Sequence, residues 1–264
     1  MTVWVFIVIA LFGLLIGILS GMFGVGGGIM IIPTLNLVFH LPALASAATS
    51  LFVVAPTSIS GAYRNFRQGN IDIKAALMVG SAGACASTIS SLFSEKVPDL
   101  IILLLSACLI IYCAISIIRG AFKLGKEAQE QTPKTFFKSS FSLFAARIVL
   151  GVFAGSMAGI VGLGGGFIIV PLAISLFGYS FKQATAVSLL SIAIIAVPGI
   201  VTHAILGHVW YLYGLALMVG TIPGANIGVR IVSKIPEKAI RLAFGALLVC
   251  AGVMLVASKL LPGA

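Results

Sequence analysis

The chain has 264 residues, of which 60% are hydrophobic and only 8% are charged, and its mean hydropathy is +1.22. The polar residues are too few to cover the surface of a water-soluble protein of this size. The composition therefore excludes a soluble protein and indicates an integral membrane protein. The net charge of +10 does not indicate nucleic-acid binding, because the basic residues lie in short segments between apolar runs. We expect them to set the orientation of the chain in the membrane.

The chain begins with an uncharged apolar run, residues 3–39, which is longer than the roughly 20 residues of one membrane-spanning helix. It has neither a basic leader nor a small-residue cleavage site, so we expect a retained membrane segment and not a cleaved signal peptide. Its middle has the sequence GMFGVGGG, and consecutive glycines disfavour a continuous helix. The run is therefore predicted to form two helical pieces around a glycine break.

Six further helices and a second broken run are predicted along the chain. The helices are expected over about 43–62, 75–93 and 100–118 in the first half and over 183–203 and 209–231 in the second half, where a last helix follows the loop at 234–238 and ends near Lys259. The second broken run covers 143–177, with its break at 162–166. The polar stretch 119–142 is predicted to be a cytoplasmic linker, so the expected domains are residues 1–118, 119–142 and 143–264.

The two broken runs are copies of each other. Residues 13–33 (GLLIGILSGMFGVGGGIMIIP) align without a gap with residues 151–171 (GVFAGSMAGIVGLGGGFIIVP) at an offset of 138. The matched positions are Gly13, Gly17, Gly21, Gly24, Gly26, Gly27, Gly28 and Pro33 with Gly151, Gly155, Gly159, Gly162, Gly164, Gly165, Gly166 and Pro171. The match indicates an internal duplication of nearly the whole chain.

The positions of the basic residues favour two inverted repeats. If each broken run crosses the membrane once, the best division of the 16 Lys and Arg residues is 10 inside against 6 outside. If each run returns to its starting side or crosses twice, 14 face the cytoplasm and only Lys96 and Lys259 lie outside. We therefore predict an all-α polytopic protein whose two inverted-topology repeats each contain a broken run and three transmembrane helices. Both termini are expected outside.

The glycine breaks are the predicted binding site. A helix that begins at Gly28 or Gly166 presents unpaired backbone N–H groups and the positive end of its dipole, which suits an anion. The predicted site glycines are Gly24, Gly26, Gly27, Gly28, Gly162, Gly164, Gly165 and Gly166. The alternative is that glycines only permit close helix packing, and we expect this for Gly13, Gly17, Gly21 and their counterparts, which are spaced by four.

Polar residues inside apolar segments are the next candidates, because their placement in lipid is costly. They are Asn36, Thr49, Ser50, Ser188 and Asn226, although Ser and Thr hydroxyls can also bond to their own helix. All six acidic residues lie in or beside loops, so no carboxylate relay is expected within the membrane. The three histidines are expected at the interface, and the four cysteines are expected to be small buried hydrophobes. No metal or cofactor site is predicted.

The duplicated motif G-x-x-G-x-G-G-G-x-x-x-x-P, seen here as GMFGVGGGIMIIP and GIVGLGGGFIIVP, resembles the sulfite exporter TauE/SafE family of membrane permeases. The resemblance implies a multi-pass plasma-membrane (cell inner-membrane) transporter that exports a small sulfur-containing anion such as sulfite or sulfoacetate. An anion that leaves a negative-inside cell gains roughly 2.3 kcal/mol per charge per 100 mV, so membrane potential could drive export. An importer or channel for a related anion, a membrane-embedded enzyme and a structural protein are the alternatives. A homo-oligomer is compatible with the sequence.

Overall fold

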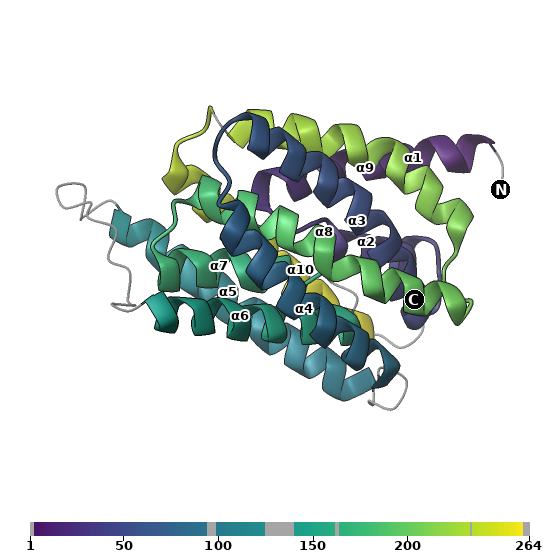
Figure 1. Ribbon diagram of the computed structural model, residues 1–264. Helices are drawn as coiled ribbons and strands as arrows, with labels where there is room; N and C mark the ends of the chain where they lie inside the picture. The colour runs from purple at the N-terminus through teal and green to yellow at the C-terminus, as the bar shows by residue number, and fades with distance from the viewer. Residues whose placement is uncertain (1–2, 94–98, 125–139, 162–163, 233, 261–264) are drawn as a thin grey trace.

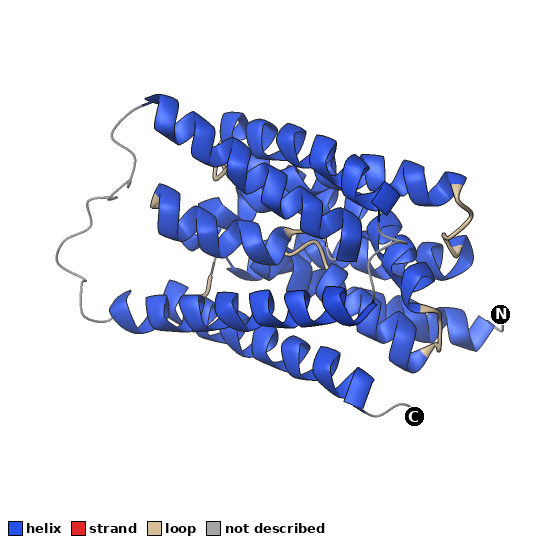
Figure 2. Ribbon diagram, turned by 90° about the horizontal axis from the view of Figure 1, so that it is seen from below, coloured by secondary structure: helices blue, strands red, loops and turns tan. Residues whose placement is uncertain are grey.

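The computed structural model of the chain describes residues 3–93, 99–124, 140–161, 164–232 and 234–260, and in these residues every regular element is helical (Figures 1 and 2). The elements are α1 Val3–Phe23, α2 Gly28–Pro33, η1 Thr34–Val38 (a π-helix), α3 Ala43–Arg67, α4 Ile73–Phe93, α5 Asp99–Leu124, α6 Ser140–Val161, α7 Gly166–Phe177, α8 Phe181–Ile205, α9 Tyr211–Val232 and α10 Glu237–Leu260. Among the described residues α1, α3, α4, α6, α8 and α9 are long and apolar enough to span a membrane. The predicted all-α polytopic class is confirmed.

Several helices extend beyond the apolar segments that predicted them. Helix α3 continues to Arg67, and α5 continues to Leu124. Arg64 and Arg67 occupy the last turn of α3, where cations interact favourably with the helix dipole. The expected linker 119–142 is therefore partly helical at both ends, while its centre, residues 125–139, lies outside the described part of the chain.

Two stripes of glycine bring helices from different halves into backbone contact. The first stripe lies on α1 and contacts the backbone of α9: Gly13 lies against Leu217, Gly17 against Thr221, and Gly21 against Ala225. A Cβ on any of these three glycines would overlap the α9 backbone. Gly151, Gly155 and Gly159 of α6 lie in the same way against Val79, Gly83 and Ser87 of α4. The packing interpretation of these glycines is therefore right.

The order of these contacts gives the directions of the helices in the first half. The α1–α9 contacts advance in the same direction along both helices, so α1 and α9 are parallel. The contacts of α3 with the α9 segment also advance in the same direction: Thr49 contacts Trp210, Thr57 contacts Thr221, and Ser60 contacts Asn226. Helix α3 is therefore also parallel to α9. Since α1 and α3 run in one direction, α2 and η1 between them carry the chain back toward the end where α1 begins.

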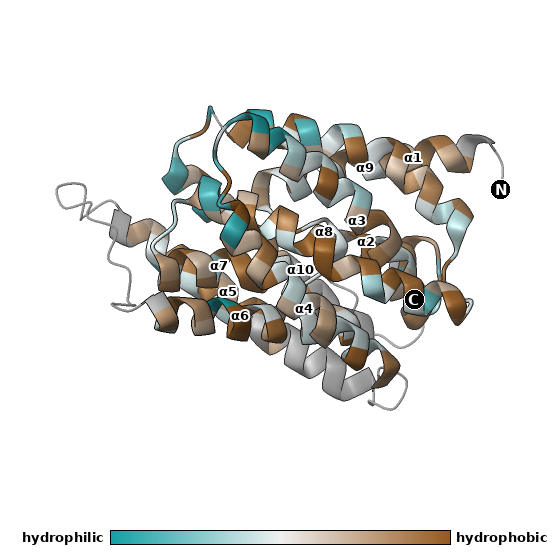
Figure 3. Cartoon of the chain, in the orientation of Figure 1, coloured by the Kyte–Doolittle hydropathy of each residue, from teal (hydrophilic) through white to brown (hydrophobic). Residues whose placement is uncertain are grey.

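In the second half the two helices that flank the short helix are again parallel to each other, but they run in the opposite direction to α1 and α3. Helix α6 is parallel to α4, and α8 is also parallel to α4, because Ala76 and Gly80 contact Ser191 and Ile194. Helix α7 therefore returns the chain between α6 and α8. Helices α3 and α8 are antiparallel, with Gly61 against Leu189 and Gly199 against Leu51. The connections α3–α4, α7–α8 and α9–α10 lie at one end of the bundle, where Figure 3 shows hydrophilic residues gathered.

The short helices that follow the glycine breaks lie in the core. Ile31, Leu35, Phe167, Ile168 and Ile169 are all at most 1% exposed. By contrast, the outer faces of α1 and α6 expose large apolar side chains, with Leu15 61% and Val149 67% exposed. An apolar exterior is what a lipid environment requires. Helices α1 and α6 therefore lie at the lipid-facing surface, and the short helices α2 and α7 lie at the centre of the protein.

Candidate functional site

Each broken run ends its first helix in a tip of glycines with left-handed backbone. Gly24, Gly26 and Gly27 have φ of 72°, 75° and 92°, and Gly164 and Gly165 have φ of 74° and 72°. Side chains other than hydrogen are strained in this region, which explains why glycine is needed here. Gly28 then begins α2 and Gly166 begins α7, while Gly162 lies outside the described residues.

The two glycine tips, residues 24–28 and the described residues 164–166, meet in the middle of the bundle. Gly26 and Gly164 both pack against Val54 of α3 and Ile192 of α8. A Cβ on Gly166 would lie 2.8 Å from the Gly24 carbonyl oxygen. Gly26 and Gly164 are equivalent at the offset of 138, as are Val54 and Ile192, so the two tips meet through equivalent residues of the two halves.

One predicted hydroxyl contacts a tip directly. Ser188 Oγ of α8 donates a 2.7 Å hydrogen bond to the carbonyl oxygen of Gly24, and nearby Thr185 packs against the same glycine. The equivalent serine, Ser50 of α3, is fully buried, and its hydroxyl has no hydrogen-bond partner. Helix α8 thus holds the backbone of the first tip in place.

The other predicted polar residues lie in contacts between helices or at their ends. Asn36 donates its amide to the Leu41 carbonyl oxygen at 2.9 Å, within the η1–α3 connection. Thr49 Oγ1 accepts the Trp210 backbone N–H at 3.0 Å, and the Asn226 amide donates to Ser60 Oγ. The structure does not join these three residues to the tips, and their role as ligand contacts stays a prediction.

The cysteines and histidines form no candidate metal centre among the described residues. The expectation of four buried cysteines is wrong for Cys85, Cys108 and Cys250, which are exposed, and right for Cys113. An apolar run in a membrane protein has a lipid-facing side as well as a core-facing side, so apolar sequence alone does not predict burial. His203 and His208 approach each other at the α8–α9 turn, with 3.5 Å between their Nδ1 atoms.

A cluster at the loop end of the bundle was missed by the sequence analysis. Arg147 Nη2 of α6 lies 3.1 Å from Asp72 Oδ2 and 2.9 Å from the Tyr179 hydroxyl, which itself donates to Asp72 Oδ2 at 2.6 Å. Burial alone would raise the pKa of Asp72, but hydrogen bonds from Tyr179 and the Ala75 N–H, together with Arg147, hold it below its usual value. Burial, followed by the bond to Asp72, raises the pKa of Tyr179 to about 12. Arg147 was detectable as the one charged residue within the second broken run.

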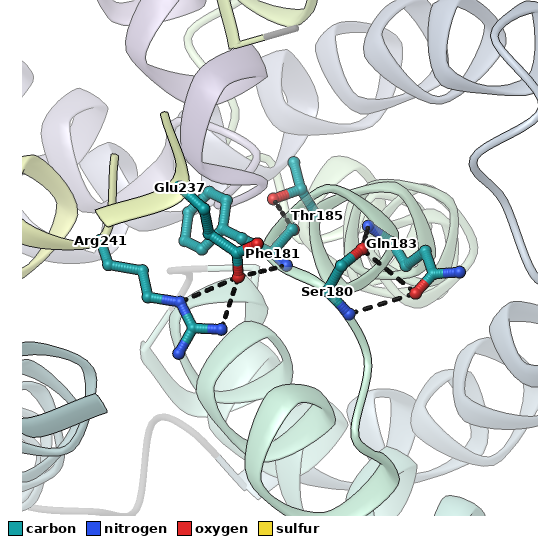
Figure 4. A network of polar contacts seen from close by, with 6 residues as sticks. All are labelled: Ser180, Phe181, Gln183, Thr185, Glu237 and Arg241. Atoms are coloured by element: carbon teal, nitrogen blue, oxygen red, sulfur yellow. Dashed lines mark hydrogen bonds and ion pairs between the residues drawn. The ribbon is translucent and has the colours of Figure 1, made fainter. Parts of the chain in front are cut away.

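A second network joins the start of α8 to the start of α10 (Figure 4). Glu237 Oε1 accepts the Phe181 backbone N–H at 3.1 Å and pairs with Arg241 Nη2 at 2.5 Å. Phe181 also packs against Phe244, and Phe244 stacks on Phe23, which directly precedes Gly24. All three phenylalanines are at most 2% exposed, so an aromatic layer lies between the first tip and this end of the bundle.

The cavity beside the described residues of the first tip leaves little space for a ligand in this conformation. A cavity of about 10 Å³ lies beside Gly27 and is lined by Ser20 and by apolar side chains from α1, α2 and α10. This is room for about one water molecule. A larger cavity of about 580 Å³ lies between α6 and α7, where residues such as Phe153 and Leu172 give it an apolar lining that is unsuited to an anion.

Comparison with known proteins agrees with a membrane transporter. The model of the family described as Sulfite exporter TauE/SafE matches residues 9–255. The chain is 32% identical over 243 residues to the probable membrane transporter protein YdhB of Bacillus subtilis, an alignment that covers 92% of this chain and 96% of the relative. It is 26% identical over 258 residues to the probable membrane transporter protein MJ0441 of Methanocaldococcus jannaschii, with 92% of each chain covered. No solved structure matches the chain.

Proposed function

Since the chain belongs to the sulfite exporter TauE/SafE family, we propose that it exports a small sulfur-containing anion, such as sulfite or sulfoacetate, across the plasma membrane. The family and the names of the relatives indicate a membrane transporter and not an enzyme. The observation that carries the proposal is the meeting of two glycine tips at the centre of the bundle. Such a pair of helix breaks at membrane depth is typical of transporter binding sites.

The anion is proposed to bind between the tips. Glycine lets a ligand approach the backbone closely, and α7 directs the N–H groups of its first turn toward its start at Gly166. No lysine or arginine occurs in residues 13–33 or 151–171, so within these two stretches the attraction is proposed to come from backbone dipoles. Weak, distributed attraction suits a carrier, because the anion must leave the site as well as enter it.

Transport requires the tips to separate. Gly166 approaches the Gly24 carbonyl oxygen so closely that an oxyanion cannot fit between the two backbones in this conformation. We propose that the two halves are inverted repeats that move against each other and open the meeting point to one side at a time. The opposite directions of α1 and α6 support this. Opening toward the loop end would also displace the layer of Phe23, Phe181 and Phe244.

Purified protein in liposomes tests the function. With a membrane potential that is negative on the loading side, we expect sulfite or sulfoacetate to leave in a saturable, potential-dependent manner. Flux that grows linearly with concentration would favour a channel, and chemical turnover without transmembrane movement would favour an enzyme. In a cysteine-free background, Lys238→Cys should be labelled only from the cytoplasmic side. Labelling only from outside would contradict the proposed orientation.

A further inference from the structure

Ser58 of α3 places a hydroxyl group at the first tip. The residue is fully buried at 0% exposure, and its Oγ has no hydrogen-bond partner. A Cβ on Gly26 would lie 2.9 Å from Ser58 Oγ and 2.9 Å from Val54, which also contacts the second tip at Gly164. The hydroxyl therefore lies against the first tip, close to the point where the two tips meet.

An unpaired hydroxyl in this position needs a physical explanation. A serine within a helix can bond to the carbonyl four residues earlier, and the preceding residue Thr57 does so with Val53 at 2.7 Å. Ser58 makes no such bond. A buried donor without an acceptor costs stability, so such groups in native proteins often serve a ligand or a water molecule.

The hydroxyl also breaks the symmetry of the site. At the offset of 138, Gly26 is equivalent to Gly164 and Val54 to Ile192, but Ser58 is equivalent to Ala196. Ala196 is buried and has no side-chain donor. Gly26 and Gly164 therefore share a left-handed backbone and the same apolar neighbours, and of these two glycines only Gly26 has a hydroxyl beside it at this position.

We propose that Ser58 Oγ donates a hydrogen bond to an oxygen of the transported anion and holds the anion beside Gly26, nearer to the first tip than to the second. This inference rests on the proposed anion export and adds to it a side-chain donor and an off-axis position. The ligand class is an oxyanion of sulfur or a sulfonate, whose oxygens are acceptors for a hydroxyl.

Ser20 of α1 is the matched control. It is also buried, at 2% exposure, and its Oγ has no partner. However, it lies beside Gly27, whose other near neighbours, Ile16 and Ile31, belong to the same run, and it lines the cavity of about 10 Å³. At the offset of 138 Ser20 is equivalent to Ala158, just as Ser58 is equivalent to Ala196. The fold therefore accommodates alanine at the position equivalent to each serine.

The test compares Ser58→Ala and Ser20→Ala in the purified full-length protein, with sulfite and sulfoacetate as probes in calorimetric titrations. Loss of a hydrogen bond to a charged ligand should raise Kd about tenfold or more in Ser58→Ala. Ser20→Ala should change Kd less than about twofold. Melting temperatures without anion should stay near that of the wild type in both variants.

Equal Kd values for Ser58→Ala and the wild type would overturn the assignment of Ser58 and leave anion export intact. Failure of the wild type to bind any sulfur oxyanion would overturn the proposed function itself, and Ser58 would then have no such role. If Ser58→Ala does not fold, Ser58→Cys serves instead, because a thiol keeps a small side chain and donates only weakly. An unchanged Kd in that variant would also contradict the proposal.

Discussion

Gly17 and Gly26 lie in the same apolar run, yet their surroundings differ in kind. Gly17 has φ in the helical range and faces the backbone of Thr221, which cannot move without shifting the whole of α9. Gly26 has a left-handed φ of 75° and faces the ends of side chains, Val54, Ser58 and Ile192, which can turn or shift. The stripe glycines therefore hold the bundle together, and the tip glycines shape a meeting point that can open.

The largest effect is expected from a side chain inserted into a stripe. Gly155→Val would place three carbons against the backbone of Gly83, so α6 and α4 would have to separate. We expect a loss of about 3–5 kcal/mol or failure to fold, measured by thermal unfolding in detergent. Gly252→Ala in α10 is the control, because its nearest neighbour would be Ile110 at 3.4 Å. If both variants melt alike, the stripes do not determine stability.

A smaller loss of stability but a larger loss of transport is expected at the tip. Gly26→Ala adds left-handed strain of about 1–2 kcal/mol and fills space against Val54 and Ser58. We expect folded protein whose anion flux falls at least tenfold. Gly207→Ala separates the effect of backbone strain from the effect of filled space. Gly207 has a similar φ of 73°, but no atom lies within 4 Å of an added Cβ. Loss of flux in that control as well would mean that strain alone explains the defect.

The smallest loss of stability is expected from the ion pair that lies beside only one of the two stripes. The α4–α6 stripe is tied at its loop end by Asp72 and Arg147, whereas the positions equivalent to them at the α1–α9 stripe are Trp210 and Ile9. Asp72→Asn should cost no more than about 1 kcal/mol at pH 7, because the carboxylate is 36% exposed.

The pH dependence of this loss has a defined sign. Because the pKa of Asp72 is lowered below 3.8, its contribution is complete above that pH and is lost as the pH falls through the lowered value. The melting temperatures of the wild type and of Asp72→Asn, compared from pH 7 to pH 3, should therefore converge in acid. A difference that grows in acid would contradict the role of the ion pair. Tyr179→Phe removes one hydrogen bond to the carboxylate but keeps the ion pair, and it should give a smaller shift.

Much of this architecture could be predicted from local patterns. The glycine spacing indicated both the stripes and the breaks, because helical periodicity at Gly13, Gly17 and Gly21 ends where consecutive glycines begin. What the sequence could not indicate was which helix each stripe contacts. Small residues show where a helix packs closely but carry no information about its partner, so the pairing of α1 with α9 in the other half was not foreseen.

The candidate site was less predictable for a related reason. Asn36 and Asn226 are candidates because amides are costly in lipid, but in the fold each amide donates to a protein oxygen, of Leu41 and of Ser60 respectively. Ser58 looks like any other helical serine in the sequence. Only the fold shows that its hydroxyl is buried, unpaired and beside Gly26. The absence of a hydrogen bond is a property of the assembled helices and cannot be read from residue type.

Helix α1 of the first half packs on α9 of the second half, and this pairing limits when the native helix contacts can form during synthesis. Helix α1 leaves the ribosome well before its partner α9, which begins only at Tyr211. At about 5–20 residues per second, roughly 10 to 40 seconds separate the two helices. During this interval the glycine face of α1 has no native partner, so lipid or the insertion machinery must shelter it. The nascent chain therefore completes the contact between α1 and α9 only when its last fifth arrives.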